Sequence, residues 1–398
     1  MLYEGQVMKQ KNILIICHSY ASFQKDSIEE LSKFFSNVYV LVRYNPISEI
    51  ARYLPIQSLQ PFRKDKKIDL SDKPENVHVF LTPVYYAPID SQYKILGKKH
   101  LSAVEKIINN HHLQFEIIHA HFTWSAGYVG AKLKEHYSVP LVVTAHGYDI
   151  YSFPFKDPIW KNNIKYVLET ADTIITVSQN NLDCIRELDV DTPVHVIQNG
   201  FRSDLFYHRD TFDCRKTLEI PLNRKIILTV GNLETIKGQR YLVEAVKEIT
   251  QTRKDILCVI IGLGRLHNAL KHQIRSLGLN DFVILAGGKP HNEIPLWMNA
   301  CDIFVLPSLN EGNPTVMFEA IGCGKPFVGT KVGGISDVIS SEVCGLLVDP
   351  ADPKDLVKKI LSALDRKWDR EKILAYAERF TWENIVKDII HVYMQVLK

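Results

Sequence analysis

The chain has 398 residues, which is long enough for two domains of ordinary size, each with its own core. Charged residues make up 23% of it and the formal net charge at pH 7 is only +3, which excludes a nucleic-acid binder that works by neutralising many phosphates. The seven cysteines include no CxxC pair and several lie within apolar runs, so a disulfide framework is excluded and free thiols in a reducing compartment are indicated.

Short apolar strands alternate with helical patterns from one end of the chain to the other. The strands predicted in the first half are residues 12–17, 38–42, 77–82, 116–121, 141–146, 172–178 and 194–200. Those predicted in the second half are residues 225–231, 255–262, 282–287, 302–308 and 326–330. Strands that alternate with helices predict an α/β protein with two parallel, doubly wound, Rossmann-like sheets joined by right-handed crossovers.

The apolar core of residues 12–17 is too short for a secretory signal, and no apolar run approaches the roughly 18 residues that span a membrane. We therefore expect a cytoplasmic protein. Two basic segments, residues 61–73 and 94–100, are open to two interpretations. Such runs are usually solvated, and the alternative is peripheral contact with an anionic inner membrane face or with a phosphorylated acceptor.

The break between the domains is predicted between Gln198 and Phe206, where a strand ends at Asn199-Gly200 and an irregular polar stretch follows. We therefore expect an N-terminal domain over residues 1–200 and a C-terminal domain over residues 201–380. A last amphipathic helix is predicted over residues 381–398, with Thr381 as its cap.

The segment from Cys301 to Pro326 carries the most specific pattern. A buried strand leads into a polar turn and then into a helix that we expect to begin at Pro314. The free amides of Thr315 and Val316, with roughly half a positive charge at the helix N-terminus, could bind a diphosphate. Glu311 and Glu319 could accept hydrogen bonds from sugar and ribose hydroxyls, although two glutamates at this spacing could also be a solvated helix face.

The sequence EGNPTVMFEA in this segment resembles the E-x7-E motif of the retaining glycosyltransferases of the GT-B fold, glycosyltransferase family 4. The resemblance extends over nearly the whole chain. It implies two Rossmann-like domains that face each other across a cleft, with the acceptor on the N-terminal side and a nucleotide sugar on the C-terminal side. It also implies that the last helix crosses back to the N-terminal domain, and that Asn313 in the turn contributes to donor binding.

The sequence HGYD after the strand at 141–146 is similar to the H-G-x-D motif of the same family. The resemblance makes His146 the residue that faces the donor sugar, while Gly147 lets the backbone approach a ligand. His119 and His121 fall on one face of the preceding strand. Because no third ligand is evident, we reject a metal site there and regard His121 as either a residue of the acceptor pocket or a packed structural histidine.

Lys237 matches the phosphate-binding lysine of the family and is expected near the start of a helix, where it would offset charge on the departing diphosphate. Asn232 occupies the place where the family commonly has an arginine. Gly288 and Lys289 match the turn that lines the base pocket. Gly262 and Gly264 form half of a dinucleotide fingerprint, but the acidic residue expected at a later strand end is missing, so NAD is excluded.

The resemblance implies transfer of a hexosyl group from a UDP- or GDP-linked sugar to a glycan or lipid-linked acceptor, with retention of configuration, no obligatory metal and no other cofactor. His146, Lys237 and Glu311 are the expected catalytic residues. The first strand–helix turn has Ser19, Ala21 and Ser22 where the family often has paired glycines. Two alternatives remain, a sugar-nucleotide epimerase of related architecture and a nucleotide-sugar-binding subunit without catalysis.

Overall fold

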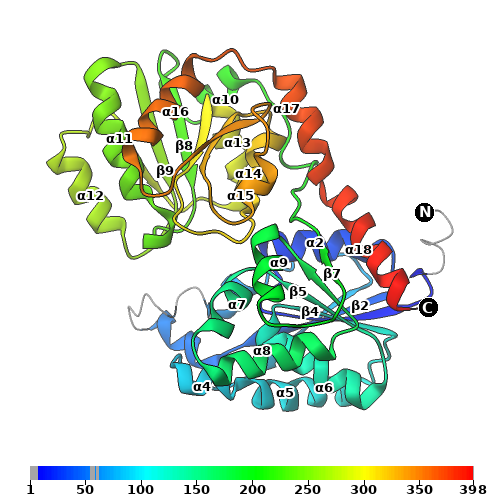
Figure 1. Ribbon diagram of the computed structural model, residues 1–398. Coiled ribbons are helices and arrows are strands. Elements are labelled where there is room, and N and C mark those ends of the chain that lie inside the picture. The colour runs from blue at the N-terminus through cyan, green and yellow to red at the C-terminus, as the bar shows by residue number, and fades with distance from the viewer. Residues whose placement is uncertain (1–7, 54–58, 60–61, 398) are drawn as a thin grey trace. The chain divides into compact units, whose positions relative to one another are not determined.

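The computed structural model describes residues 8–53, 59 and 62–397 (Figure 1). Pro61, the first residue of one predicted basic segment, lies outside these ranges. The chain divides into a first unit, Met1–Gln198 with Ile385–Lys398, and a second unit, Asn199–Asn384. Each unit contains one sheet in which every strand pairing is parallel.

The described residues of the first unit form a seven-stranded sheet in the order β3-β2-β1-β4-β5-β6-β7. Its strands are β1 (Asn12–Cys17), β2 (Asn37–Tyr44), β3 (Val77–Pro83), β4 (Ile117–His121), β5 (Leu141–Ala145), β6 (Thr173–Thr176) and β7 (Val194–Val196). The strand order reverses between β1 and β4. In open parallel sheets, ligands bind beyond the carboxyl ends of the strands at such a switch point.

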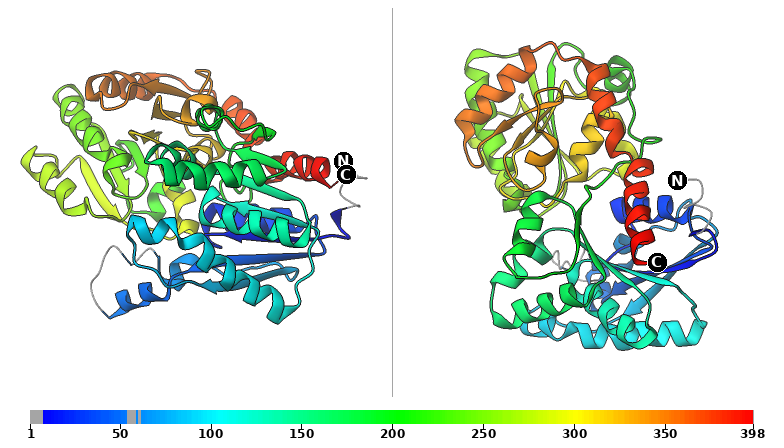
Figure 2. Two further views of the ribbon diagram at one scale, coloured as in Figure 1. Left: turned by 60° about the horizontal axis from the view of Figure 1, so that its bottom comes forward. Right: turned by 45° about the vertical axis from the view of Figure 1, so that its right-hand side comes forward.

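Helices lie on both sides of this sheet (Figures 1 and 2). They are α2 (Ser22–Ser32), α3 (Lys64–Lys67), α4 (Asp90–Lys94), α5 (Leu96–His111), α6 (Tyr128–Tyr137), α7 (Tyr148–Tyr151), α8 (Pro158–Thr170), α9 (Gln179–Arg186) and α18 (Trp382–Val396). Local chemistry sets several of the starts. Asp157 caps α8 by accepting hydrogen bonds from the amides of Ile159 and Trp160, with Pro158 at the first helical position.

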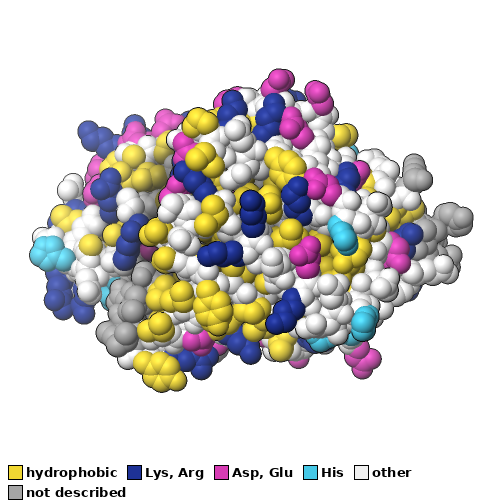
Figure 3. Space-filling model, turned by 90° about the horizontal axis from the view of Figure 1, so that it is seen from below, with side chains coloured by type: hydrophobic (Ala, Val, Ile, Leu, Met, Phe, Trp, Pro, Cys, Tyr) yellow, Lys and Arg dark blue, Asp and Glu magenta, His cyan; other side chains and the backbone are white. Residues whose placement is uncertain are grey.

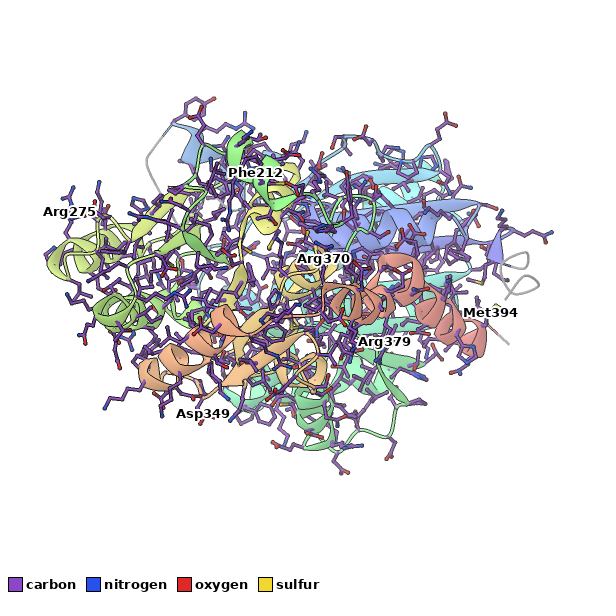
Figure 4. The ribbon with its side chains drawn as sticks, turned by 90° about the horizontal axis from the view of Figure 1, so that it is seen from above. Phe212, Arg275, Asp349, Arg370, Arg379 and Met394 are labelled. Atoms are coloured by element: carbon purple, nitrogen blue, oxygen red, sulfur yellow. The ribbon has the colours of Figure 1, made fainter. Side chains whose placement is uncertain are left out.

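The described residues of the second unit form a six-stranded sheet in the order β10-β9-β8-β11-β12-β13. Its strands are β8 (Lys225–Val230), β9 (Ile256–Ile261), β10 (Val283–Gly287), β11 (Ile303–Leu306), β12 (Phe327–Thr330) and β13 (Gly345–Val348). Its helices are α10 (Thr211–Thr217), α11 (Gln239–Thr252), α12 (His267–Ser276), α13 (Ile294–Ala300), α14 (Thr315–Gly322), α15 (Ile335–Val338), α16 (Pro353–Asp365) and α17 (Arg370–Ala377). Figure 4 labels Arg275 on α12, Arg370 on α17 and Met394 on α18.

Successive residues of a buried strand in the second unit belong to two different cores. Leu257 packs in the cluster that contains Met298 of α13 and Phe318 of α14. The next residue, Cys258, packs in the cluster that contains Leu242 of α11. Because side chains alternate between the faces of a strand, the sheet is covered by helices on both faces, as expected for a doubly wound domain.

None of the helices formed by the described residues combines the length and the apolar character needed to cross a membrane. The chain's last helix, α18, begins in the second unit at Trp382, and its residues from Ile385 onward belong to the first unit. In the first unit, Tyr393 of this helix is fully buried and its hydroxyl lies 2.6 Å from His119 Nδ1.

Candidate active site

The residues singled out in the sequence lie in the loops that follow strands at their carboxyl ends. His146 and Gly147 follow β5 in the first unit. In the second unit, Asn232 and Lys237 follow β8, and Gly288 and Lys289 follow β10. The residues of the glutamate-bracketed turn follow β11: Glu311, Asn313, Pro314, Thr315, Val316 and Glu319.

Lys237 and Glu311 come from different loops and form an ion pair. The Lys237 ammonium lies 2.7 Å from Glu311 Oε1 and 2.9 Å from Oε2. The side chain of Glu311 is only 8% exposed, whereas that of Lys237 is 24% exposed. Ser308 Oγ also donates to Glu311 Oε1, at 2.6 Å. The two residues expected to act on phosphate and on sugar therefore neutralise each other here.

The loop that carries Lys237 is held close to β11 by a glycine. Lys237 ends a single 3₁₀ turn, Thr235–Lys237, and α11 begins two residues later at Gln239, so Lys237 lies near the start of a helix as predicted. Gly238, between them, has φ +66°, and a Cβ there would lie 1.9 Å from Pro307 O. Only glycine permits both this backbone conformation and this approach of two loops.

Helix α14 begins at Thr315, one residue after the predicted start, and Pro314 takes the capping position with an extended backbone. Met317 N donates to Pro314 O at 3.1 Å. Among the described residues, no hydrogen-bond acceptor is found for the amides of Thr315 and Val316, which open the helix. Two free amides and the helix dipole make this end attractive to an anion.

Asn313 connects the turn to the start of the second unit. Asn199 N donates to Asn313 Oδ1 at 2.8 Å, and Asn199 Nδ2 donates to Asn313 O at 2.8 Å. Asn313 Nδ2 is buried, and it has no partner within the described part of the chain. Gly334 packs so closely that a Cβ there would lie 2.5 Å from this nitrogen. The amide therefore retains one donor that a ligand could use.

Glu319 is 6% exposed on α14, and its Oε1 lies 3.0 Å from His291 Nε2. His291 begins a short turn, His291–Glu293, after β10. Lys289 in the same loop lies 3.2 Å from Glu293 Oε1 and 5.4 Å from the centre of the Trp297 ring. Thus Glu319 is paired with a histidine, and Lys289 is paired with a glutamate of opposite charge.

The remaining predicted residues of the second unit present mainly backbone to this edge of the sheet. Asn232 is exposed, and its carbonyl accepts from Gln239 Nε2 at 3.0 Å. Gly288 is exposed beside Leu263, whose side chain would lie 2.7 Å from a Cβ at that position. Neither residue makes a side-chain contact with Lys237 or Glu311.

In the first unit, a buried aspartate holds the loop that carries His146. Gly147 has φ +151°, which favours glycine, and its amide donates to Asp149 Oδ1 at 2.9 Å. Asp149 Oδ2 accepts from Thr123 N at 2.7 Å, which ties the loop after β5 to the loop after β4. Burial raises the pKa of Asp149, and the hydrogen bonds from Thr123 and Gly147 act against this shift.

His146 pairs with His121. His146 Nε2 lies 3.0 Å from His121 Nδ1, and the two rings stack with centroids 5.2 Å apart. Burial lowers the pKa of His121 to about 4, and burial followed by the charge of His121 lowers the pKa of His146 well below its usual value. Both rings are therefore neutral near pH 7, and either His146 Nδ1 or His121 Nε2 carries an N–H that has no acceptor among the described residues.

His119 has a structural role. Its Nε2 lies 2.7 Å from Thr144 Oγ1 and its Nδ1 lies 2.6 Å from Tyr393 Oη, so both ring nitrogens are occupied inside the core. The rings of His119 and His121 lie 4.3 Å apart, as expected for one face of a strand. Within the described residues, no group of three His, Cys, Asp or Glu side chains is arranged to hold a metal ion.

Sequence reasoning missed the partners of these residues. Ser308 and His291 fix the two glutamates, and Asn199 fixes Asn313. Asp149 stands in the HGYD sequence, so its motif position was a usable signal. Ser308 lies three residues before Glu311 at a strand end, so its position in the sequence could also have indicated its role. The pairing of Glu319 with His291 joins positions 28 residues apart and had no local signal.

Comparison with known families gives two matches that follow one another along the chain. The family described as Glycosyltransferase Family 4 matches residues 62–205. The family described as Glycosyl transferases group 1 matches residues 210–380. The second match contains every predicted site residue of the second unit, and the first contains His146 and Gly147.

Curated relatives share moderate sequence identity with the chain. It is 29% identical over 305 residues to a D-inositol 3-phosphate glycosyltransferase of Corynebacterium diphtheriae, a match that covers 71% of each protein. It is also 29% identical over 291 residues to an uncharacterised glycosyltransferase of Methanocaldococcus jannaschii, which covers 71% of this chain and 76% of the relative.

Solved structures share the fold over almost the whole length. The sucrose-phosphate synthase of Thermosynechococcus elongatus superimposes with a TM-score of 0.77 at 22% identity, covering 97% of this chain and 99% of the other. Anabaena HepE, solved in complex with UDP, superimposes with a TM-score of 0.74 at 21% identity, covering 97% of this chain and all of the other (100%). At this level of identity the likeness establishes the architecture alone.

Proposed function

The chain belongs to glycosyltransferase family 4 and has the GT-B fold, and from this premise we propose that it moves a hexosyl group from a UDP- or GDP-linked sugar to an acceptor hydroxyl with retention of configuration. It is a glycosyltransferase with a nucleotide-sugar donor. The observation that carries the proposal is the Lys237–Glu311 ion pair in the second unit, formed between the loops after β8 and β11.

The donor diphosphate would bind at the N-terminus of α14. The amides of Thr315 and Val316 point their donors out of the helix, and the helix dipole favours negative charge there. Lys237 lies within reach of Glu311, four residues before Thr315, so its ammonium can turn from the carboxylate to a phosphate oxygen. In that position it stabilises the charge that grows on the leaving diphosphate.

Glu311 would take up the sugar. Once Lys237 engages phosphate, the Glu311 carboxylate keeps the hydrogen bond from Ser308 and has free lone pairs for sugar hydroxyls. Glu319 on α14, paired with His291 of the turn after β10, would accept the ribose diol. We assign the charge stabilisation to Lys237 and the α14 terminus, so that the reaction has no obligatory metal.

His146 would contact the transferred sugar. Its pKa is lowered well below its usual value, so near pH 7 it is a neutral ring that can donate or accept a hydrogen bond. No residue in either unit is placed as a dedicated nucleophile in this proposal. The leaving phosphate oxygen itself takes the acceptor proton while the sugar passes through an oxocarbenium-like state, and positioning supplies most of the rate.

We propose a glycan or lipid-linked acceptor and peripheral contact of the first unit with an anionic membrane. Hydrophobic side chains gather with Lys and Arg side chains between them on the face shown in Figure 3. A cavity of about 490 Å³ in the first unit is lined by Asp90, Ser91, Lys94, Ile95, Lys98, Trp124, Tyr128, Ile159 and Asn163. Ile95 and Ile159 are 53% and 58% exposed, and the exposed Lys98 beside such apolar groups favours anionic lipid, whereas Lys94 is paired with Asp90 and Asp157.

The test is a thermal-shift screen of UDP- and GDP-sugars, because a ligand that binds the folded state stabilises it by mass action. A stabilising donor is then incubated with the enzyme alone and with candidate acceptors. Transfer or slow donor hydrolysis supports the proposal. Epimerisation of the donor alone identifies an epimerase instead, and tight binding without any turnover identifies a binding subunit.

A further inference from the structure

The first unit contains a second group of polar residues at the carboxyl edge of its sheet, beside the loop that carries His146. His18 is the first residue after β1, and Arg43 is the last residue but one of β2, where it pairs in register with Thr82 of β3. Lys67 ends α3, and its Nζ donates to His18 O at 2.6 Å. This is the edge of an open parallel sheet at which ligands bind.

Arg43 is a buried cation that has no anionic partner in the part of the chain that the structure describes. Arg43 is 5% exposed, and its guanidinium donates hydrogen bonds to Ser125 Oγ at 2.8 Å and to Tyr93 Oη at 3.2 Å. The guanidinium also lies 5.9 Å from the centre of the Tyr86 ring. Across the described ranges, no carboxylate pairs with it. A guanidinium stays charged in proteins, so its burial costs free energy that hydroxyl groups offset only in part.

The hydrogen bonds behind Arg43 are consistent with a neutral network. Ser125 Oγ accepts from Arg43 and lies 2.9 Å from His100 Nδ1, to which its hydroxyl can donate. His100 Nε2 lies 3.3 Å from Thr82 Oγ1, which in turn donates to Val42 O at 3.1 Å. A single tautomer of neutral His100 satisfies this chain. It therefore contributes no negative charge to balance Arg43.

Lys67 adds a second uncompensated positive group. Within the described parts of the chain its ammonium has no carboxylate partner and contacts only the His18 carbonyl and the Phe62 ring, 5.7 Å away. Burial, followed by the charge of Arg43, lowers the pKa of Lys67 to about 7. The site thus disfavours a second positive charge unless an anion is present.

His18 provides an unused polar atom at the same place. Its Nε2 is buried and has no hydrogen-bond partner within the described residues. Its ring stacks on Phe122 with centroids 4.5 Å apart, and the other neighbour of Phe122 is His146, with centroids 4.6 Å apart. A group bound at His18 would therefore lie one aromatic ring away from the histidine proposed to face the donor sugar.

We propose that Lys67, Arg43 and His18 form a binding site for an anionic group, a phosphate monoester or a carboxylate, carried by the acceptor. Lys67 and His18 are partly exposed and would contact the anion, while Arg43 lies behind them and supplies positive potential. The assignment of the anion to the acceptor rests on the proposed transferase function. The existence of the anion site does not.

A purely structural role accounts for the contacts of Arg43, but it accounts neither for a second buried cation at Lys67 nor for the unpaired nitrogen of His18. Arg43 joins β2 to Ser125 and Tyr93 and so ties three segments together. Lys67 ties α3 to the His18 carbonyl, but that hydrogen bond does not require a positive charge beside Arg43. A histidine nitrogen buried without a partner also costs free energy in a core. One anion at this position would accept hydrogen bonds from His18 Nε2 and Lys67 and would balance the charge of Arg43 behind them.

The test compares Lys67→Gln with Lys66→Gln in the full chain. Both changes remove one lysine charge from α3, but Lys66 is exposed and makes no contact with His18. Inorganic phosphate and acetate are titrated separately at constant ionic strength, with thermal unfolding and calorimetry as readouts. Arg43 is not the primary variant because its replacement would also disturb folding.

We expect phosphate or acetate to stabilise the wild type and Lys66→Gln equally, and to bind Lys67→Gln at least tenfold more weakly. Histidine nitrogen NMR reads out the site directly, because His18 Nε2 should shift on anion binding. The anion that binds more tightly identifies the acceptor group as a phosphate monoester or a carboxylate. Equal binding by the two variants, or a His18 signal that does not move, overturns the proposal.

The transferase function is tested independently by titrating the wild type with UDP- and GDP-sugars. Phosphate binding at His18 without any nucleotide-sugar binding would refute the proposed function and leave the anion site standing. Conversely, nucleotide-sugar binding together with equal phosphate binding by the wild type and Lys67→Gln would support the proposed function and refute the anion site.

Discussion

The Lys237–Glu311 pair allows the role of Lys237 in catalysis to be separated from its role in stability. Lys237→Ala removes the group proposed to stabilise the leaving diphosphate, and loss of one preorganised donor typically costs about 2.7–4 kcal/mol of transition-state stabilisation. We therefore expect kcat to fall by about two to three orders of magnitude. The measurement is initial-rate kinetics at saturating donor.

The same variant should also destabilise the second unit. Without Lys237, the Glu311 carboxylate, 8% exposed, keeps a single side-chain hydrogen bond from the described residues, the one from Ser308. Charge-assisted hydrogen bonds are worth about 1.5–3 kcal/mol, so we expect a loss of about 2 kcal/mol in the free energy of unfolding. Adding Glu311→Gln removes the stranded charge, and the double variant should regain part of the stability but none of the activity.

Lys331→Ala is the matched control. Lys331 forms an exposed ion pair with Asp349, which is labelled in Figure 4, and such a pair is worth at most about 1 kcal/mol. A Lys237→Ala enzyme with near-normal kcat would refute the role of the lysine at the diphosphate. Failure of Glu311→Gln to restore stability in the Lys237→Ala background would refute the stranded-charge argument.

Three further predictions concern other residues of the two units. Glu319→Gln should raise KM for the donor about tenfold with kcat nearly unchanged, because it contacts the ribose in ground and transition states alike; an equal fall in kcat would contradict this. Below its unfolded pKa of 6.5 and down to about 4, His121 takes up a proton only when unfolded, so its contribution to the free energy of unfolding should fall by about 2 kcal/mol between pH 7 and pH 5, in addition to the losses from other buried histidines such as His146. Urea unfolding at both pH values checks this, and His121→Gln should reduce the pH dependence. Gly238→Ala should destabilise far more than Gly278→Ala, which costs about 1–2 kcal/mol of left-handed strain, because both glycines have positive φ but only Gly238 faces a backbone oxygen, 1.9 Å from a Cβ. Similar melting temperatures for the two variants would show that the loops can separate.

The fold was predictable because most strands are apolar runs bounded by turns. Every strand predicted in the sequence is present, and the family resemblance and the GT-B architecture are confirmed. The strand β13, Gly345–Val348, was missed. It has four residues, begins with a glycine and lies at the edge of its sheet, so it offers too short an apolar run to be recognised without its partner β12.

The candidate site was less predictable because its pairings join distant parts of the chain. The sequence placed Lys237 and Glu311 at strand ends, but they are 74 residues apart, and no local pattern indicates that they form an ion pair. The start of α14 was one residue off because a proline is equally acceptable as cap or first helical residue. Arg43 directly follows the strand predicted over residues 38–42, and nothing in the sequence indicated that its charge would be buried with no carboxylate partner among the described residues.

The two units differ in how they balance charge at the edges where ligands are proposed to bind. In the second unit, Lys237 pairs with Glu311, so a diphosphate must replace an existing ion pair. Binding there exchanges one set of charge interactions for another, and the net gain is smaller than the number of contacts suggests. In the first unit, Arg43 and Lys67 lack carboxylate partners among the described residues. An anion can therefore interact with both positive charges without breaking an existing ion pair. An anionic acceptor would thus be bound by charge that folding leaves uncompensated, whereas the donor would be held weakly enough for its diphosphate product to leave.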